Sequence, residues 1–217
     1  MTWFFANLDQ IGTLLVAHLA TTLPAIVLSI LIAVPIGRLA LAAKPARGAI
    51  LTTTGLLYAI PSLPLLIAIP LLTGLPLRST ATMIVALTVY GVALLARTAT
   101  DAFGSVPPDV TDAAVASGLS ASRRLFGVEL PLALPVLIAG TRVVAMSTIG
   151  LATIGALIGI PSLGSLLTDG FQRGIAAEVA TGIILTLVLA AVIDGVLWGI
   201  GRMAQPWTRA TAVGRTA

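Results

Sequence analysis

The stretch DAAVASGLSASRRLFGVELP, residues 112–131, is the core of a polar segment, residues 98–131, that lies between two long apolar runs. This segment holds six charged residues, which are Asp101, Asp109, Asp112, Arg123, Arg124 and Glu129. The triplet that begins at Asp112 predicts the start of a short helix. Gly118 permits a positive φ, so the chain can turn there into a second short helix. We interpret the segment as a water-facing element on which a soluble partner docks.

The composition outside this segment excludes a soluble globule. The chain has 217 residues, of which 58% are hydrophobic and 9% are charged, whereas a soluble domain carries about 25% charged residues. The expected fold class is therefore an all-α polytopic membrane protein in a lipid bilayer. Cysteine is absent and His18 is the single histidine. We therefore expect no disulfide, no metal site and no histidine-based catalytic triad.

Five apolar runs are long enough for membrane spans, which need about 20 residues each. They cover residues 17–36, 50–72, 79–95, 132–157 and 179–200. Residues 1–16 contain Trp3, Phe4 and Phe5, aromatic residues that suit a membrane–water interface. We therefore expect an N-terminal interfacial segment at 1–16, a membrane domain at 17–203 and a tail at 204–217.

The basic residues predict the orientation of the spans. If the N-terminus lies outside, ten basic residues fall on the cytoplasmic side: Arg38, Lys44, Arg47, Arg97, Arg123, Arg124, Arg142, Arg202, Arg209 and Arg215. Only Arg78 and Arg173 fall outside. This orientation places the polar segment and the C-terminal tail in the cytoplasm. Because the basic residues are scattered at helix ends, we expect no nucleic-acid partner.

Three prolines interrupt the second run, and none of them can donate a backbone hydrogen bond. They are Pro61, Pro64 and Pro70. Such breaks persist at membrane depth where neighbouring helices or a water-lined cavity satisfy the freed carbonyls. The run predicts either a kinked helix packed in the bundle or a helix that lines a translocation path, and the two are compatible. The candidate path residues are Tyr58, Pro61, Ser62, Pro64 and Tyr90.

Two charged residues lie within predicted spans, at similar depth in the cytoplasmic half. Arg142 is in the fourth span and Asp194 is in the fifth. A charge at this depth is unfavourable unless it pairs or reaches the interface. The pair predicts an interhelical salt bridge or a role in the substrate path.

The sequence lacks the groups that would supply chemistry or energy. A phosphate-binding loop needs a Lys after Gly, and the only lysine, Lys44, precedes Pro45. No catalytic residues are expected, so the chain is not expected to be an enzyme. Acids in the spans are also too few for a typical ion-coupled carrier. We therefore expect a pore-forming subunit that another chain powers.

The polar segment resembles the EAA loop of permeases from binding-protein-dependent ABC importers. The family form is E-A-A-x3-G-x9-I-x-L-P, and the matching residues here are Asp112, Ala113, Ala114, Gly118, Val128, Leu130 and Pro131. Asp replaces Glu, and Val replaces Ile. The resemblance implies a MetI-like core of five transmembrane helices and a cytoplasmic coupling helix that seats in an ATPase subunit. Arg123 and Arg124 can meet acidic or phosphate-rich surroundings there. The partner ATPase, and not this chain, would bind ATP and Mg.

Residues 60–66, 130–140 and 154–164 are similar to the osmoprotectant branch of that family, which imports glycine betaine, choline, carnitine or proline betaine. The resemblance implies three partners: ABC ATPase subunits, a second permease subunit that is identical or paralogous, and an extracytoplasmic substrate-binding protein. It also implies a bacterial plasma (inner) membrane. The alternatives are a methionine-type amino-acid importer permease, a secondary carrier, and a membrane protein with a structural or assembly role.

Overall fold

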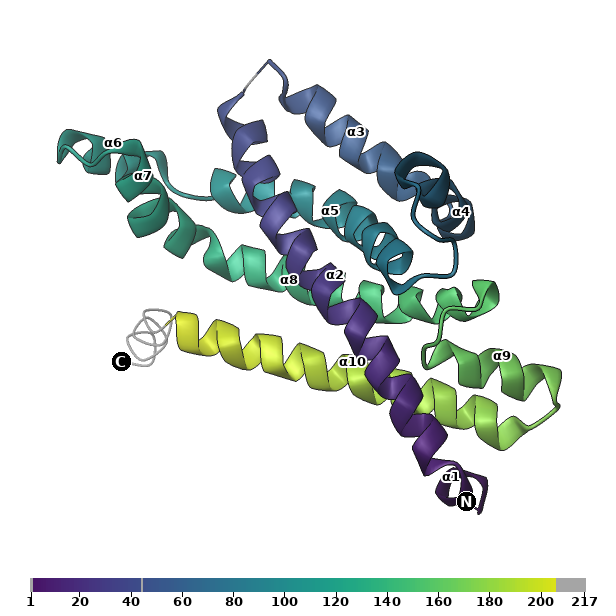
Figure 1. The fold of residues 1–217 in the computed structure, drawn as a ribbon. Coiled ribbons are helices and arrows are strands. Elements are labelled where there is room, and N and C mark those ends of the chain that lie inside the picture. Colours follow the sequence, from purple (N-terminus) through teal and green to yellow (C-terminus); the bar gives the residue numbers. More distant parts are fainter. Residues whose placement is uncertain (1, 44, 206–217) are drawn as a thin grey trace, which may run out of the picture.

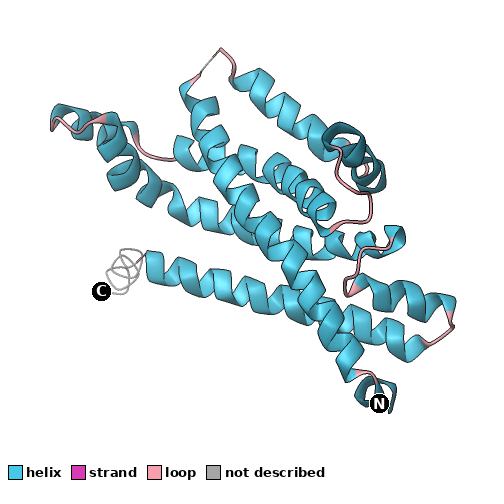
Figure 2. Ribbon diagram, in the orientation of Figure 1, coloured by secondary structure: helices cyan, strands magenta, loops and turns pink. Residues whose placement is uncertain are grey.

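The chain is described by a computed structural model that covers residues 2–43 and 45–205. All regular elements in these residues are helices (Figures 1 and 2). In chain order they are α1 (Thr2–Ala6), α2 (Leu8–Ala42), α3 (Arg47–Ala59), α4 (Ser62–Thr73), α5 (Thr80–Gly104), α6 (Pro108–Ala116), α7 (Ala121–Arg124), the π-helical turn η1 (Leu125–Glu129), α8 (Leu130–Ala152), the 3-10 turn η2 (Thr153–Ile158), α9 (Gly164–Gln172) and α10 (Ala176–Ala204). The predicted tail beyond Gln205, with Arg209 and Arg215, lies outside the described residues, as does Lys44.

The five apolar runs all form helices, which confirms the predicted fold class. Four stretches are each long and apolar enough to cross a membrane: α2, α5, the continuous stretch Ala121–Ile158 and α10. The helices α3 and α4 pass the same test only as a pair, and they bend by 109° at a short break. The described residues therefore contain four candidate spans, or five if this bent pair crosses the membrane as one. The second run is therefore a broken helix. Its break begins at Ile60, whose backbone is extended (φ −66°, ψ 126°), because a residue before proline disfavours the helical region.

The helices α2 and α5 extend furthest beyond the predicted apolar runs. The helix α2 begins at Leu8, so it passes without interruption through the expected boundary at residues 16 and 17. The helix α5 continues to Gly104, nine residues past the predicted end of the third span. In both cases polar residues continue a helix that the apolar run began, because backbone hydrogen bonding does not stop where hydropathy falls.

The helices α2 and α5 cross at short distance because each has a glycine at the contact, where a larger residue would clash with the other helix. A Cβ atom built on Gly37 of α2 would lie 2.7 Å from the backbone nitrogen of Thr100. A Cβ atom on Gly91 of α5 would overlap the hydroxyl of Ser29. Small residues of this kind allow membrane helices to pack by backbone approach.

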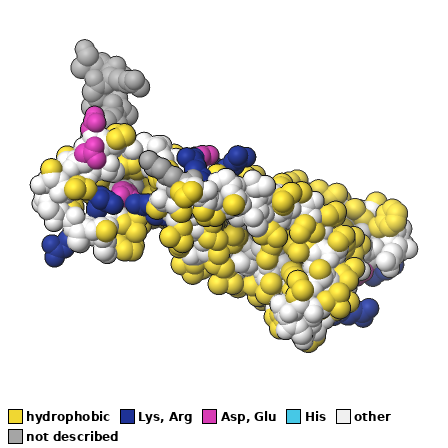
Figure 3. Space-filling view, turned by 90° about the horizontal axis from the view of Figure 1, so that it is seen from above, with side chains coloured by type: hydrophobic (Ala, Val, Ile, Leu, Met, Phe, Trp, Pro, Cys, Tyr) yellow, Lys and Arg dark blue, Asp and Glu magenta, His cyan; other side chains and the backbone are white. Residues whose placement is uncertain are grey.

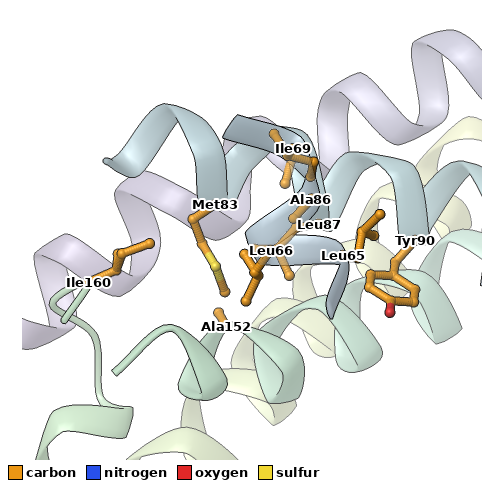
Figure 4. Packing of buried hydrophobic residues seen from close by; sticks show 10 residues of the cluster. Leu65, Leu66, Ile69, Met83, Ala86, Leu87, Tyr90, Ala152 and Ile160 are labelled. Atoms are coloured by element: carbon orange, nitrogen blue, oxygen red, sulfur yellow. The ribbon is translucent and has the colours of Figure 1, made fainter. Parts of the chain in front are cut away.

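Separate apolar clusters stabilise the two ends of the bundle. In Figure 4, Leu65, Leu66 and Ile69 of α4 pack on α5, and Ala152 and Ile160 close the cluster from the other side. A second cluster joins the first turns of α2 to α9 and α10, and a third joins the end of α5 to the start of α8. The third cluster lies directly behind α6 and α7, so it fixes the base of the polar segment.

The polar segment projects from one end of the molecule. Figure 1 shows α6 and α7 at the same end as the C-terminal end of α10, whereas α1 and α9 lie at the opposite end. In the space-filling view, side chains of both charges lie at the end with α6 and α7 and along one edge, and a few Lys or Arg side chains lie at the opposite end (Figure 3). Hydrophobic side chains are spread over the body between the two ends. This distribution gives the apolar body one markedly polar end.

Candidate functional site

The first helix of the polar segment begins earlier than the sequence indicated. We expected it to start at Asp112, but α6 begins at Pro108 and has Asp109 in its first turn. Proline suits this position, because the first turn of a helix leaves its N–H groups unbonded and proline has the required φ. Asp112 and Ala113 therefore lie in the body of α6, and the negative charge nearest the helix start is Asp109.

The turn after α6 confirms the expected role of Gly118. This glycine has φ +76°, a region that L-residues with a Cβ atom rarely adopt. The N–H of Leu119 donates to the carbonyl of Ala114 (3.1 Å), and the N–H of Gly118 donates to Val115 (2.9 Å). These two bonds form a Schellman motif, which ends the helix. The chain then enters α7, where the Ser120 hydroxyl accepts from the N–H of Arg123.

The side chains of α6 divide into an inward and an outward set. Ala114 is buried within the chain, whereas Asp112 and Ala113 are exposed. Three apolar side chains of the segment are also exposed, although they lie at the polar end of the molecule: Val110, Val115 and Phe126, the last at 66%. Exposed apolar side chains at the polar end of a membrane protein can mark an interaction surface. We call the surface formed by Val110, Asp112, Ala113, Val115 and Phe126 the loop face.

The two arginines of α7 occupy different environments. Arg123 is exposed. Arg124 turns inward, and its Nε lies 2.8 Å from Oε1 of Glu129. A cavity of about 450 Å³ lies beneath the loop, lined by Asp112, Val115 and Arg124 among others. Asp112 and Val115 are exposed to solvent as well as to this cavity, whereas Arg124 is only partly exposed. Arg123 is therefore open to solvent, whereas Arg124 is held by Glu129. Leu130 and Pro131 open α8, where Leu130 packs against the cluster at the base of the segment.

The candidate path residues gather at the break between α3 and α4. The Tyr90 hydroxyl of α5 donates to the carbonyl of Ile60, the residue at the break. Tyr58 stacks edge-to-face on Tyr90 at a ring distance of 6.3 Å and is 51% exposed. Pro61 precedes α4 and is exposed, and Pro64 lies exposed in its first turn with Ser62 half-buried. A neighbouring helix thus satisfies one of the carbonyls that the break frees.

The two charged residues within the spans contact each other. Arg142 of α8 donates from Nε to Oδ1 of Asp194 in α10 (2.7 Å) and from Nη2 to Oδ2 (2.6 Å). Both side chains are partly exposed within this single chain. The arrangement is an interhelical salt bridge, which was one of the two roles that the sequence predicted for them.

Sequence reasoning missed the ion cluster behind the loop. Glu129 is buried and accepts hydrogen bonds from Arg124 and from Arg38 of α2. The sequence did contain a signal for a paired glutamate. Glu129 lies between Val128 and Leu130 at the start of an apolar run, and Glu is almost never fully buried unless it is paired. The partner could not be found from sequence, because Arg38 lies 91 residues away.

Known proteins resemble this chain in sequence over most of its length. The model of the family described as "binding-protein-dependent transport system inner membrane component" matches residues 25–200. The osmoprotectant import permease protein OsmW of Salmonella typhimurium is 32% identical over 196 residues, which is 88% of this chain and 90% of that protein. The choline transport system permease protein OpuBB of Bacillus subtilis is 32% identical over 190 residues, 87% of this chain and 86% of that protein.

A solved structure has the same fold. A chain of the MetNI methionine ABC transporter, in an inward-facing conformation, superposes with a TM-score of 0.78 and covers 90% of this chain and 98% of that chain. Its sequence identity is 23%, so the likeness concerns the fold alone. The family match covers most of the chain, including the polar segment and the spans on either side of it. The chain therefore belongs to the family of binding-protein-dependent transport system inner membrane components.

Proposed function

We propose that this chain is the permease subunit of an ABC importer for a small osmoprotectant, such as glycine betaine, choline, carnitine or a similar quaternary amine. The observation that carries the proposal is the loop face, an apolar and charged surface that projects from the polar end of a membrane bundle. The substrate class is supported by the relatives, two of which are named for osmoprotectant and choline transport and are 32% identical to this chain.

The loop face is the surface on which an ATPase subunit docks. Ala113 presents a small side chain, so a partner can approach the backbone of α6 closely. Val115 and Phe126 supply exposed apolar area, and Asp112 supplies a negative charge. Arg123 of α7, outside the loop face, is also exposed and adds a positive charge. Interfaces commonly combine an apolar centre with a charged rim in this way. The ATPase would bind ATP and Mg, and its movement would reach the spans through α6 and α7.

The proposed location is the bacterial plasma (inner) membrane, with the N-terminus outside and α6 and α7 in the cytoplasm. The bias of basic residues supports this orientation. It places α9 on the outer side, where Phe171 is 83% exposed. That exposed ring, on a short helix at the outer end, supports docking of a substrate-binding protein at residues 160–178. A second permease subunit would complete the path.

The proposed path runs beside the break between α3 and α4. The exposed face of α3 carries Thr52, Thr53 and Tyr58. Exposed hydroxyls on a membrane helix favour a watery path or a partner helix over lipid. Tyr58 also offers a ring face to a quaternary ammonium group, which aromatic rings attract. Tyr90 packs edge-to-face on this ring, and Pro61, Ser62 and Pro64 follow it in the chain at the break.

Reconstitution tests the transport proposal. The permease, its ATPase and its binding protein are placed in liposomes, and uptake of labelled choline, glycine betaine and carnitine is measured with and without internal ATP. We expect uptake of at least one of these compounds, and only with ATP. Uptake of methionine alone would support the amino-acid importer instead. Uptake that continues in energised vesicles depleted of ATP would support a secondary carrier.

A matched pair of glycine variants tests the docking surface. Gly118→Asp places a charged side chain and a strained backbone at the turn of the loop face. Gly48→Asp makes the same change at the start of α3, where a Cβ meets no atom within 4 Å. We expect Gly118→Asp to abolish co-purification of the ATPase and Gly48→Asp to preserve it, with both variants still inserted in the membrane. Full recovery of the ATPase with Gly118→Asp would contradict the assignment.

A further inference from the structure

Glu129 joins three parts of the chain that are distant in sequence or separated by a turn. It is 6% exposed and lies at the end of η1, where the loop meets α8. Its Oε2 accepts from Nε of Arg38 at 2.7 Å, and its Oε1 accepts from Nη2 of Arg38 at 3.3 Å and from Nε of Arg124 at 2.8 Å. Both carboxylate oxygens are therefore bonded. We call these three residues the inner clamp.

The π-helical turn is what allows Arg124 and Glu129 to meet. They are five residues apart, a spacing that an α-helix of about 3.6 residues per turn puts on different faces. In η1 the N–H of Leu130 bonds to the carbonyl of Leu125, which is the i→i+5 pattern of a π-helix. This wider turn brings residues five apart onto the same face. The local backbone and the ion pair therefore support each other.

The inner clamp lies at η1, the turn that connects the loop to α8 and that has the least regular backbone hydrogen bonding of this stretch. The stretch Ala121–Ile158 is continuous, but a π turn interrupts the regular bonding, and Gly127 inside it has no side chain to pack. Without a brace, α7 could tilt on this turn while α8 stayed still. Arg38 supplies the brace, since it ties the end of η1 to a separate helix.

The helix tied in this way reaches the opposite end of the molecule. At about 1.5 Å per residue, the 35 residues of α2 extend about 50 Å. Its inner part carries Arg38, and its outer part carries His18, whose Nδ1 accepts from the N–H of Leu163 at the start of α9 (3.3 Å). Glycine contacts hold its middle against α5. A movement passed to Arg38 would therefore be carried toward the outer end.

We infer that Glu129 is a positioning residue for coupling: it holds α7 at a fixed distance from the inner end of α2, so that a displacement of the loop face moves α2 with it. The inference rests on the proposed function for the source of that displacement, an ATPase on the loop face. The clamp itself is a property of the permease alone. The buried carboxylate cannot lose both arginines without becoming an unpaired buried charge, which is strongly unfavourable.

The positioning is tested on the purified permease without any partner. Since the chain contains no cysteine, Leu39→Cys and Ser122→Cys give two unique sites for spin labels, both exposed, one on α2 and one on α7. We expect a narrow distribution of label distances. Arg38→Gln should broaden it, while leaving the Arg124–Glu129 pair to keep the carboxylate satisfied. Glu129→Gln should broaden it as well.

Asp101→Asn is the matched control. It removes another acid at the polar end, one that is largely exposed and lies 3.9 Å from Arg47. We expect this variant to keep the narrow distribution. A distribution that stays narrow in both Arg38→Gln and Glu129→Gln would overturn the inference, whatever the transport assays show.

The consequence for coupling is tested in the assembled complex. We expect Arg38→Gln to retain the ATPase and its ATP hydrolysis while substrate transported per ATP falls by about tenfold or more. The variant loses two hydrogen bonds to a charged group, and each corresponds to a factor of about ten. Asp101→Asn should keep the normal ratio. A normal ratio in Arg38→Gln, or loss of the ATPase from that complex, would overturn the inference. If the unmodified complex failed to transport, the proposed function would be contradicted, but the label distances measured on the permease alone would still test the inner clamp.

Discussion

Arg142 of α8 and Asp194 of α10 form a two-bond ion pair, with Nε–Oδ1 and Nη2–Oδ2 distances of 2.7 and 2.6 Å. The pair connects α10 to the rest of the bundle, and α10 is otherwise the least buried of the spanning helices. A single charge left in a membrane span is unfavourable, whereas removal of both charges leaves none to satisfy.

We therefore expect Arg142→Leu and Asp194→Leu each to lower the melting temperature of the purified permease, and the double variant to lower it less than either single change. Thermal unfolding in detergent measures this. Transport by the double variant then separates the two roles that the sequence left open. Retained transport fits a structural bridge, and lost transport with a recovered melting temperature fits a role in the path. Additive losses would contradict the pairing.

Tyr90 provides the second prediction, because its hydroxyl bonds to the carbonyl of Ile60 at the break between α3 and α4. Tyr90→Phe keeps the ring and removes the donor, so a carbonyl freed by the break loses its partner. We expect a loss of about 1 kcal/mol or more in the free energy of unfolding, measured by denaturant titration. Tyr58→Phe is the control, since its ring is half-exposed, and we expect a change within about 0.5 kcal/mol. Equal effects would contradict the capping role of Tyr90.

The sequence predicted the fold class because its signals were local. Apolar runs long enough for spans, the positions of prolines, and the spacing from Asp112 to Pro131 each depend on residues close together in the chain. Gly118 was predicted correctly for the same reason, since a helix that ends and restarts within a few residues needs a positive φ at the turn. Asp194 could be predicted as the partner of Arg142, because few acidic residues lie in the predicted spans.

Other features depended on contacts that no local pattern contains. The start of α6 was predicted at Asp112, from the acid-Ala-Ala triplet. The helix begins at Pro108 instead, because proline is favoured at the first position of a helix. The hydrogen bond that Tyr90 donates to Ile60 at the bend comes from another helix, 30 residues away in the chain. Arg124 was expected to take part in ATPase coupling, which stays a prediction. Its bond to Glu129 depends on a π turn that apolar periodicity does not reveal.

Gly91 supports a third prediction, about the crossing of α2 and α5. A Cβ atom there would overlap the Ser29 hydroxyl and lie 2.7 Å from the Ser29 Cβ. Overpacking of this kind costs about 1–3 kcal/mol, so we expect Gly91→Ala to lower the free energy of unfolding by that amount. Adding Ser29→Gly should recover part of the loss, and adding Ser29→Ala should recover less, because its Cβ remains.

Gly195→Ala serves as the control for that series. Gly195 lies inside α10, and a Cβ there meets no atom within 4 Å. The same substitution should therefore stabilise the helix by up to about 1 kcal/mol, through helix propensity alone. If Gly91→Ala also stabilised the protein, the close approach of α2 and α5 at this point would be wrong.

His18 carries the last prediction, which concerns the outer end of α2. The imidazole is fully buried, and its Nδ1 accepts a hydrogen bond from the backbone N–H of Leu163, just before α9. His18→Leu removes that acceptor and leaves a buried N–H without a partner, which costs about 1–3 kcal/mol. His18→Asn retains an oxygen acceptor on a shorter side chain. We expect hydrogen exchange of a peptide covering residues 160–166 to be fast in His18→Leu and slower in His18→Asn.

Equal protection of this peptide in both variants would mean that the imidazole only fills space. Faster exchange confined to this peptide in His18→Leu would identify the histidine as the group that fixes the start of α9 against α2.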